Sequence, residues 1–206
     1  MKNIKRAVLL AFVLVIVCSM RCSAATRYNA FLMGDSIIDN YPHSANGLEY
    51  YLKKDTSFNV VCDYSYEGTL VCTDAKAQRA KLVKQLKKYV GQKNVVILSM
   101  GTNDYFKKCE NNHNKLLKKR LAEIREIDPK VKIVIIIPTH IYRVRNDAKI
   151  RAIYDYQEND KWMSKYTIDL KTKDYLSSSD IRSDCLHFTS SGYKKTVKQI
   201  KRVLGL

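Results

Sequence analysis

The sequence predicts one α/β domain in which helices cover both faces of a mainly parallel sheet, giving three layers. Three observations lead to this fold class. Short apolar segments alternate with amphipathic segments, two of the apolar segments are hydrophobic almost throughout, and no repeat or low-complexity linker interrupts the alternation. Strands covered on both faces have continuous apolar runs, and strand–helix alternation produces right-handed crossovers between parallel strands.

Five short segments are rich in β-branched or aromatic residues and therefore predict strands. NVVILSM and VKIVIIIP are apolar along most of their length, which favours positions inside the sheet, whereas YTIDL is the weakest candidate. In chain order the predicted strands are 28–33, 58–63, 94–100, 131–138 and 166–170.

Three longer segments predict helices, because their apolar residues recur every three or four positions. A polar segment over 171–186 lies before the last helix, and loops of this length in compact domains are often functional. The predicted helices and their apolar faces are 75–90 (Ala80, Val83, Leu86, Val90), 113–127 (Leu117, Leu121, Ile124, Ile127) and 190–204 (Tyr193, Val197, Ile200, Leu204).

The first 25 residues have the pattern of a secretory signal peptide, so they are left out of the fold. Basic residues precede an apolar run that is too short to span a bilayer, which needs about 20 apolar residues, and small residues follow it. We expect cleavage near Ala25 and a secreted or extracytoplasmic domain over 26–206; a retained anchor is the alternative. The features are Lys2, Lys5 and Arg6, the apolar run 7–17, and the small residues Ser23–Ala25.

The chain is strongly basic, with a formal net charge of +17. Four basic residues and no acidic ones lie in the predicted signal, so the mature domain keeps +13. This charge suits an anionic cell-wall polymer or membrane surface. Many lysines alternate with apolar residues, as on solvated helix faces, and no nucleic-acid module is present, so nucleic acid is not an expected partner.

Four cysteines remain in the predicted mature domain: Cys62, Cys72, Cys109 and Cys185. An even number in an exported chain indicates disulfides, with three possible pairings. We favour Cys62–Cys72 together with Cys109–Cys185, because these bonds would hold the loops described next. No two of these cysteines have the CxxC spacing of zinc sites, and we expect no metal.

Polar clusters follow the predicted strands at 34–36, 67–69 and 101–104, and another lies at 184–187. Ligand sites of open α/β sheets lie outside the carboxyl ends of the strands, so the clusters are expected to converge.

The residue types in these clusters supply the parts of an acyl-transfer site. Ser36 offers a hydroxyl nucleophile, His187 an imidazole base, and Asp184 a carboxylate that can orient the imidazole. The backbone N–H groups of Ser36 and Gly68 and the side-chain amide of Asn103 offer donors for an oxyanion hole.

These blocks resemble those of a known family, the SGNH hydrolases or GDSL-type esterases and lipases. The matching residues are GDSI at 34–37, a glycine at 68, GTND at 101–104, and DCLH at 184–187 followed by FTSSGY. Ile37 replaces the family's frequent leucine. The resemblance spans nearly the whole mature chain. It implies a flavodoxin-like sandwich with a five-stranded parallel sheet, no metal or organic cofactor, and a serine esterase.

By position, the resemblance makes Ser36 the nucleophile, His187 the base and Asp184 its partner, with Ser36, Gly68 and Asn103 forming the oxyanion hole. The favoured substrates carry short acyl groups, such as acetyl, on a carbohydrate or cell-surface glycan. The alternatives are a lysophospholipase or lipase and a non-catalytic glycan-binding module. A flavodoxin-like cofactor binder is disfavoured, because no glycine-rich phosphate loop follows the first strand.

The remaining candidates have structural interpretations. Asp104 is expected to hold its loop. His140 is interpreted as a polar residue that closes a strand, and His43 and His113 as surface residues.

Overall fold

The computed structural model describes residues 27–39, 46–106, 110–138, 155 and 160–206. The predicted signal peptide, His43, Cys109 and His140 lie outside these described residues, so the predictions about them are not tested by the structure.

Five parallel strands form one sheet in the order β2-β1-β3-β4-β5. This is the flavodoxin-like strand order, in which the direction of winding reverses between β1 and β3. The predicted α/β sandwich is therefore confirmed. The strands are β1 (Tyr28–Gly34), β2 (Phe58–Ser65), β3 (Asn94–Ser99), β4 (Lys132–Ile137) and β5 (Ile168–Lys171).

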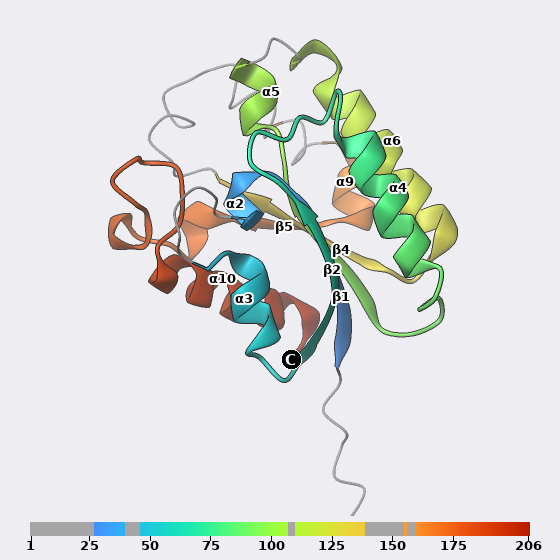
Figure 1. Ribbon diagram of the computed structural model, residues 1–206, viewed down its shortest axis with the longest axis horizontal. Coiled ribbons are helices and arrows are strands. Elements are labelled where there is room, and N and C mark those ends of the chain that lie inside the picture. Colours follow the sequence, from blue (N-terminus) through green and yellow to red (C-terminus); the bar gives the residue numbers. More distant parts are fainter. Residues whose placement is uncertain (1–26, 40–45, 107–109, 139–154, 156–159) are drawn as a thin grey trace, which may run out of the picture.

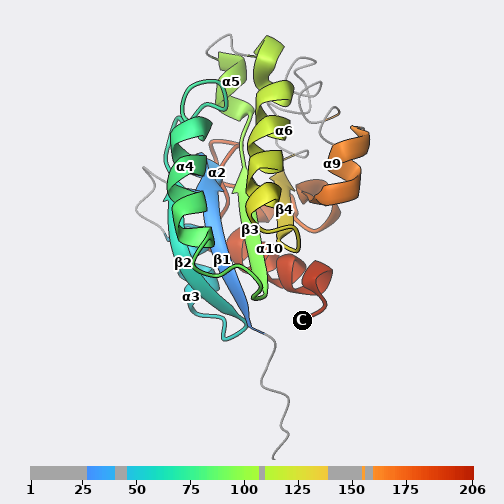
Figure 2. The same cartoon turned by 90° about the vertical axis from the view of Figure 1, so that its right-hand side faces the viewer.

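The apolar runs occupy the inner strands, as their composition predicts. All six residues of β3 are buried, and so are all residues of β4 except Lys132. Helices cover both faces of the sheet: α3 and α10 lie on one face, and α4 and α6 lie on the other (Figures 1 and 2). The helices are α2 (Ser36–Asp39), α3 (Leu48–Lys53), α4 (Ala75–Leu86), α5 (Thr102–Phe106), α6 (Glu110–Ile127), α9 (Lys161–Tyr166) and α10 (Ser190–Leu204).

The predicted apolar face of the 75–90 helix is partly wrong. The helix ends at Leu86, Ala80 is exposed, and Val90 is 50% exposed in the turn that follows. Val83 and Leu86 are buried, as predicted, and the rest of the buried face consists of Ala75, Gln78 and Leu82. The prediction used apolar residues alone and therefore left out Gln78, which is polar but buried. Without Gln78, the apolar residues of the segment indicate a buried face that differs from the observed one.

The other two helices agree better with their predicted faces. Leu117, Leu121 and Ile124 of α6 are buried, and Ile127 packs against the core while partly exposed. In α10, Tyr193, Val197 and Ile200 are buried and Leu204 is partly buried. The polar segment over 171–186 contains two short 3₁₀ turns, Thr172–Asp174 and Ser178–Asp180, and otherwise has the loop character that the sequence predicts.

Both favoured disulfide pairs are wrong. Cys62 and Cys185 have free thiols, so neither Cys62–Cys72 nor Cys109–Cys185 forms. Cys72 is disulfide-bonded, and its partner is therefore not one of the other two described cysteines. Cys62 lies on edge strand β2, where burial raises the pKa of its thiol to about 12. The sequence shows which residues are cysteines but does not show which of them approach one another.

Within the described part of the chain, no helix has the length and apolar character needed to cross a membrane.

Candidate active site

The site begins where β1 ends, next to the point at which the sheet's winding reverses. Gly34 closes β1 beside β3, and a Cβ on Gly34 would lie 2.6 Å from the Ser99 carbonyl oxygen, so only glycine fits. Asp35 then turns the chain: its backbone N–H donates to the Ser99 carbonyl, and its Oδ1 accepts from the N–H of Ile37. Ser36 is thereby placed at the first position of α2.

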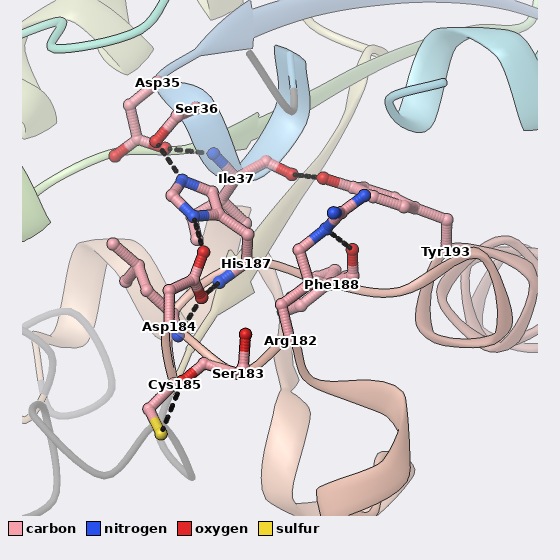
Figure 3. Close-up of polar contacts among 11 residues, drawn as sticks. Asp35, Ser36, Ile37, Arg182, Ser183, Asp184, Cys185, His187, Phe188 and Tyr193 are labelled. Carbon is pink, nitrogen blue, oxygen red and sulfur yellow. Dashed lines mark hydrogen bonds and ion pairs between the residues drawn. The ribbon is translucent and has the colours of Figure 1, made fainter. Parts of the chain in front are cut away.

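The structure brings Ser36, His187 and Asp184 together in one hydrogen-bonded chain (Figure 3). His187 Nε2 lies 2.8 Å from Ser36 Oγ, and His187 Nδ1 lies 2.9 Å from Asp184 Oδ2. Ser36 and His187 are 7% and 8% exposed, so only a small part of each is open to solvent. A hydroxyl, an imidazole and a carboxylate in this order form the arrangement that activates a serine nucleophile.

A tight loop between Arg182 and Phe188 presents the imidazole. The N–H of Arg182 donates to the His187 carbonyl at 2.8 Å, and Arg182 Nε donates to the Phe188 carbonyl at 3.0 Å. Cys185 has a left-handed backbone conformation, with φ of 56°. Its exposed Sγ contacts the Ser183 carbonyl and points away from Ser36 (Figure 3), so the thiol is not part of the hydrogen-bonded chain.

The same loop keeps Asp184 ionised. Partial burial opposes the charge, but the N–H groups of His187 and Leu186 both donate to Asp184 Oδ1, and the imidazole contacts Oδ2. These interactions outweigh the burial and lower the pKa of Asp184 to about 2. The carboxylate can therefore stabilise a positive imidazolium beside it.

Asp35 has the opposite electrostatic environment. Burial, assisted by the nearby charge of Asp104, raises the pKa of Asp35 to about 7. Only Oδ1 has a partner, the Ile37 N–H, and Oδ2 has no hydrogen-bond partner among the described residues. Asp35 thus orients α2 without forming part of the Ser36–His187–Asp184 chain (Figure 3).

Gly68 lies in the loop after β2, which hydrogen bonds tie to the end of β1. The Gly34 carbonyl accepts from the Tyr66 N–H and from Gln78 Nε2, both at 3.1 Å. Gln78 Nε2 also donates to Thr69 Oγ1 at 3.1 Å. Gly68 has φ of +71°, a left-handed conformation in which glycine is strongly favoured.

Asn103 and Asp104 hold the next part of this loop. Asn103 Nδ2 donates to the Thr69 carbonyl at 3.3 Å, which places the amide beside the residue that follows Gly68. Asp104 accepts from the N–H groups of Val71 and Cys72, at 3.0 and 3.2 Å. Asp104 therefore has the expected structural role, but the loop that these hydrogen bonds hold is the one after β2.

His113 is not a surface residue, contrary to the prediction. Its side chain is fully buried in α6, and its Nδ1 lies 3.4 Å from Asp104 Oδ2. The prediction failed because His113 follows no predicted strand, whereas the fold packs the first part of α6 against the segment after β3.

Sequence analysis missed two further residues that support the site. One is Gln78, the only polar residue among the buried positions of α4. The other is Tyr193, which was predicted as part of the apolar face of α10 but also donates its hydroxyl hydrogen to the Ile37 carbonyl at 2.9 Å (Figure 3). In both cases the sequence contains a sign of this role: a polar group within an otherwise apolar helix face indicates that the group has a buried hydrogen-bond partner.

No group of three or more His, Cys, Asp or Glu side chains suited to a metal ion occurs among the residues that the structure describes.

Comparison with known proteins gives structural matches alone: no family model and no curated sequence matches the chain. The acetylxylan esterase Axe2 from Geobacillus stearothermophilus is 17% identical, with a TM-score of 0.62 over 88% of this chain and 97% of that one. Axe2 has also been crystallised as catalytic mutants in which a serine or a histidine is replaced by alanine.

Two further solved structures are similar. An α/β hydrolase from the metagenome of Lake Arreo, Spain, is 17% identical, with a TM-score of 0.62 over 88% of this chain and 96% of that one. A member of the lipolytic G-D-S-L family from Veillonella parvula is 16% identical, with a TM-score of 0.65 over 85% of this chain and 97% of that one. The chain thus has the fold that its resemblance to the SGNH hydrolases implies.

Proposed function

We propose that this protein is an exported serine esterase of the SGNH type, with Ser36 as nucleophile, His187 as base and Asp184 as the group that orients it. One observation carries the proposal: the His187 imidazole lies within hydrogen-bonding distance of both Ser36 Oγ, at 2.8 Å, and Asp184 Oδ2, at 2.9 Å. The fold shared with a solved acetylxylan esterase and with a solved lipolytic protein of the G-D-S-L family supports it. Export is supported only by the signal-like first 25 residues.

The reaction follows from the order of these groups. His187 Nε2 takes the proton of Ser36 as Oγ attacks the ester carbonyl carbon, and the carbonyl oxygen becomes negative. The protonated imidazole then gives its proton to the leaving alcohol, and an acyl-serine remains. A water molecule, deprotonated by His187, attacks the acyl-serine; the acid leaves and Ser36 regains its hydrogen. Asp184 stays ionised throughout and stabilises the imidazolium.

The oxyanion would be bound by three donors, the N–H groups of Ser36 and Gly68 and the Asn103 amide. The hydrogen bonds that tie the Gly68 loop to Gly34, and the Asn103 amide to Thr69, support this assignment, because they connect the segments that carry the three donors. Donors fixed before reaction stabilise developing charge without reorganisation.

For the substrate, we propose short acyl groups, acetyl above all, on a carbohydrate or cell-surface glycan. This is supported by the similarity to an enzyme that is named for acetylxylan and by the basic charge of the mature domain. A lysophospholipase is the second candidate, because an anionic membrane would also attract this charge.

A panel of p-nitrophenyl esters from acetate to dodecanoate, together with acetylated xylooligosaccharides and lysophosphatidylcholine, tests the proposal. We expect the acetate esters to be hydrolysed fastest and Ser36→Ala to abolish hydrolysis. Preference for long acyl chains would favour the lysophospholipase. No hydrolysis by the wild-type protein of any member would favour a non-catalytic glycan-binding module.

A further inference from the structure

Helix α10 has a row of cations that pair with no acidic side chain in the part of the protein that the structure describes. The helix contains five basic and no acidic residues. Lys195 pairs with Asp180 at 2.6 Å and Lys201 with Asp55 at 2.9 Å, which leaves Lys194, Lys198 and Arg202 without a carboxylate partner among the described residues. All three are exposed and, at spacings of four, share one side of the helix.

This row costs the helix stability, because like charges four residues apart repel each other. An acidic residue at the middle position, Lys198, would replace both repulsions by attractions, because Glu and Lys residues at this spacing attract each other. A fold that keeps three such cations in line therefore presents a surface suited to an extended anionic ligand.

The row borders an open depression between α10 and α3, two helices that lie side by side on one face of the sheet (Figure 1). This depression has a volume of about 540 Å³ and is lined by Tyr50, Tyr51, Lys54 and Lys194, among others. A second depression of about 810 Å³ shares Lys194 with the first and continues along α10 past Lys198 and Arg202.

Two tyrosines line the α3 side of the depression, and contacts between aromatic rings fix their orientation. The Tyr51 ring is stacked on buried Tyr193, with centroids 5.8 Å apart and planes 9° from parallel. The Tyr50 ring meets Tyr51 edge-on at 5.1 Å, and Lys54 Nζ lies 4.2 Å from the Tyr50 centroid. Aromatic rings beside ammonium groups match a ligand that has both apolar ring faces and negative charges.

We propose that the α3–α10 surface, defined by Tyr50, Tyr51, Lys54, Lys194, Lys198 and Arg202, binds an acidic polysaccharide. The sugar ring faces contact the tyrosines, and the carboxylates pair with the row of cations. The inference builds on the proposed function, because a polymer bound here would have its ester groups held near Ser36. The surface lies close to that site in the fold: Ser190, which lines the first depression, is three residues from His187, and the Tyr193 hydroxyl donates a hydrogen bond to Ile37 in the helix that starts at Ser36.

A membrane fits this surface less well than a polymer chain. Peripheral membrane binding combines basic residues with exposed apolar side chains. The exposed large hydrophobic residues of the described chain are Tyr66, Val90 and Leu206, and of these only Leu206 borders either depression.

Binding of polygalacturonate, measured by affinity electrophoresis and by calorimetry at low salt, tests the inference. The triple variant Lys194→Gln/Lys198→Gln/Arg202→Gln should bind roughly tenfold more weakly, as expected for the loss of three exposed ion pairs. The matched control is Lys76→Gln/Lys84→Gln/Lys119→Gln, which removes three exposed cations from α4 and α6 on the opposite face. The control should bind like wild type.

A third variant, Tyr50→Leu, separates recognition of a sugar from attraction by charge. It keeps every cation and should still weaken polygalacturonate binding. Equal weakening in both triple variants, or unchanged binding in Tyr50→Leu, would overturn the inference. The inference would also be overturned if the wild-type protein bound phosphatidylglycerol vesicles or a thymidine oligonucleotide more tightly than polygalacturonate, and if that binding depended on the cations of α10.

Hydrolysis of p-nitrophenyl acetate, measured on the same samples, keeps the two proposals distinguishable. It should be unchanged in all three variants, because none of the substituted residues belongs to the Ser36 site. Polymer binding that depends on α10 in a protein without esterase activity would refute the proposed function and leave this inference standing.

Discussion

The carboxylate of Asp104 accepts a hydrogen bond from the backbone N–H of Val71 at 3.0 Å, so the segment after β3 holds the loop after β2. Asn103, the preceding residue, contacts the same loop at Thr69. One dipeptide therefore supplies a proposed oxyanion donor and also positions the loop that supplies another, Gly68. The full burial of Asp104 and of neighbouring His113 makes this connection rigid.

Asp104→Asn should lower kcat by about 10- to 100-fold, with a small change in KM, because small displacements of catalytic groups cost rates of this size. The two carboxylate oxygens accept from the backbone N–H groups of Val71 and Cys72, and the substitution replaces one of these oxygens by an NH₂ group, which cannot accept. Steady-state kinetics with p-nitrophenyl acetate measures the effect.

Asp128→Asn is the control for general destabilisation. Asp128 is also buried. It accepts a hydrogen bond from Nδ2 of Asn94, the first residue of β3, so it lies at the amino-terminal end of this strand, away from the site. It should lower the melting temperature without lowering kcat. Equal losses of kcat in the two variants would show that Asp104 affects the protein only through stability.

Asn103→Ala should lower kcat by about 10²- to 10³-fold, the usual cost of one oxyanion donor. The melting temperature should change little, because the amide makes a single long hydrogen bond of 3.3 Å to Thr69. Kinetics and thermal unfolding of the same preparation check both expectations. Unchanged turnover would remove Asn103 from the oxyanion hole.

Asp35 should make the protein less stable as the pH rises. Burial raises its pKa from 3.8 to about 7, so between these values the folded state holds a proton that the unfolded chain releases. The free energy of unfolding therefore falls from about pH 4 to pH 7. Urea unfolding of Asp35→Asn across this range should show a weaker decrease than wild type; an identical decrease would contradict the assignment.

Asp184 provides a comparison of opposite sign. Its pKa is lowered to about 2, so its stabilising contribution is present above about pH 4 and is lost as the pH falls toward 2. Asp184→Asn should lower the free energy of unfolding at all pH values above about 4 and alter the slope of the profile only below that pH, whereas Asp35→Asn alters the slope between about pH 4 and pH 7.

The cysteines should react very differently with a maleimide. Cys185 is exposed and should be labelled quickly, whereas the raised pKa of half-buried Cys62 should make its labelling slow. Peptide mapping without reduction should find Cys72 in a cross-linked peptide, with Cys109 as the expected partner in the predicted mature domain. A Cys62–Cys72 peptide would contradict this prediction.

Most of the fold could be predicted because its signals are local. The apolar runs of β3 and β4 determine their burial, and the residues after β1 and before α10 stand out as polar clusters at element ends. Parallel topology then requires the carboxyl ends of the strands to share one edge, which is why Ser36 and His187 could be expected to meet.

The errors concern residues whose environment depends on distant parts of the chain. His113 is polar and follows no strand, yet α6 packs it against Asp104. Gln78 is buried because it bonds the Gly34 carbonyl, a contact across 44 positions. The cysteine pairing failed for the same reason, since three-dimensional proximity is not visible in spacing.

The central claim is that His187 activates Ser36 as a nucleophile. The most direct measurement is intact-protein and peptide mass spectrometry after reaction with a fluorophosphonate. We expect a single adduct on Ser36, no adduct in Ser36→Ala, and labelling slowed by orders of magnitude in His187→Ala. Equally fast labelling in His187→Ala, or an adduct on any other serine, would contradict the claim.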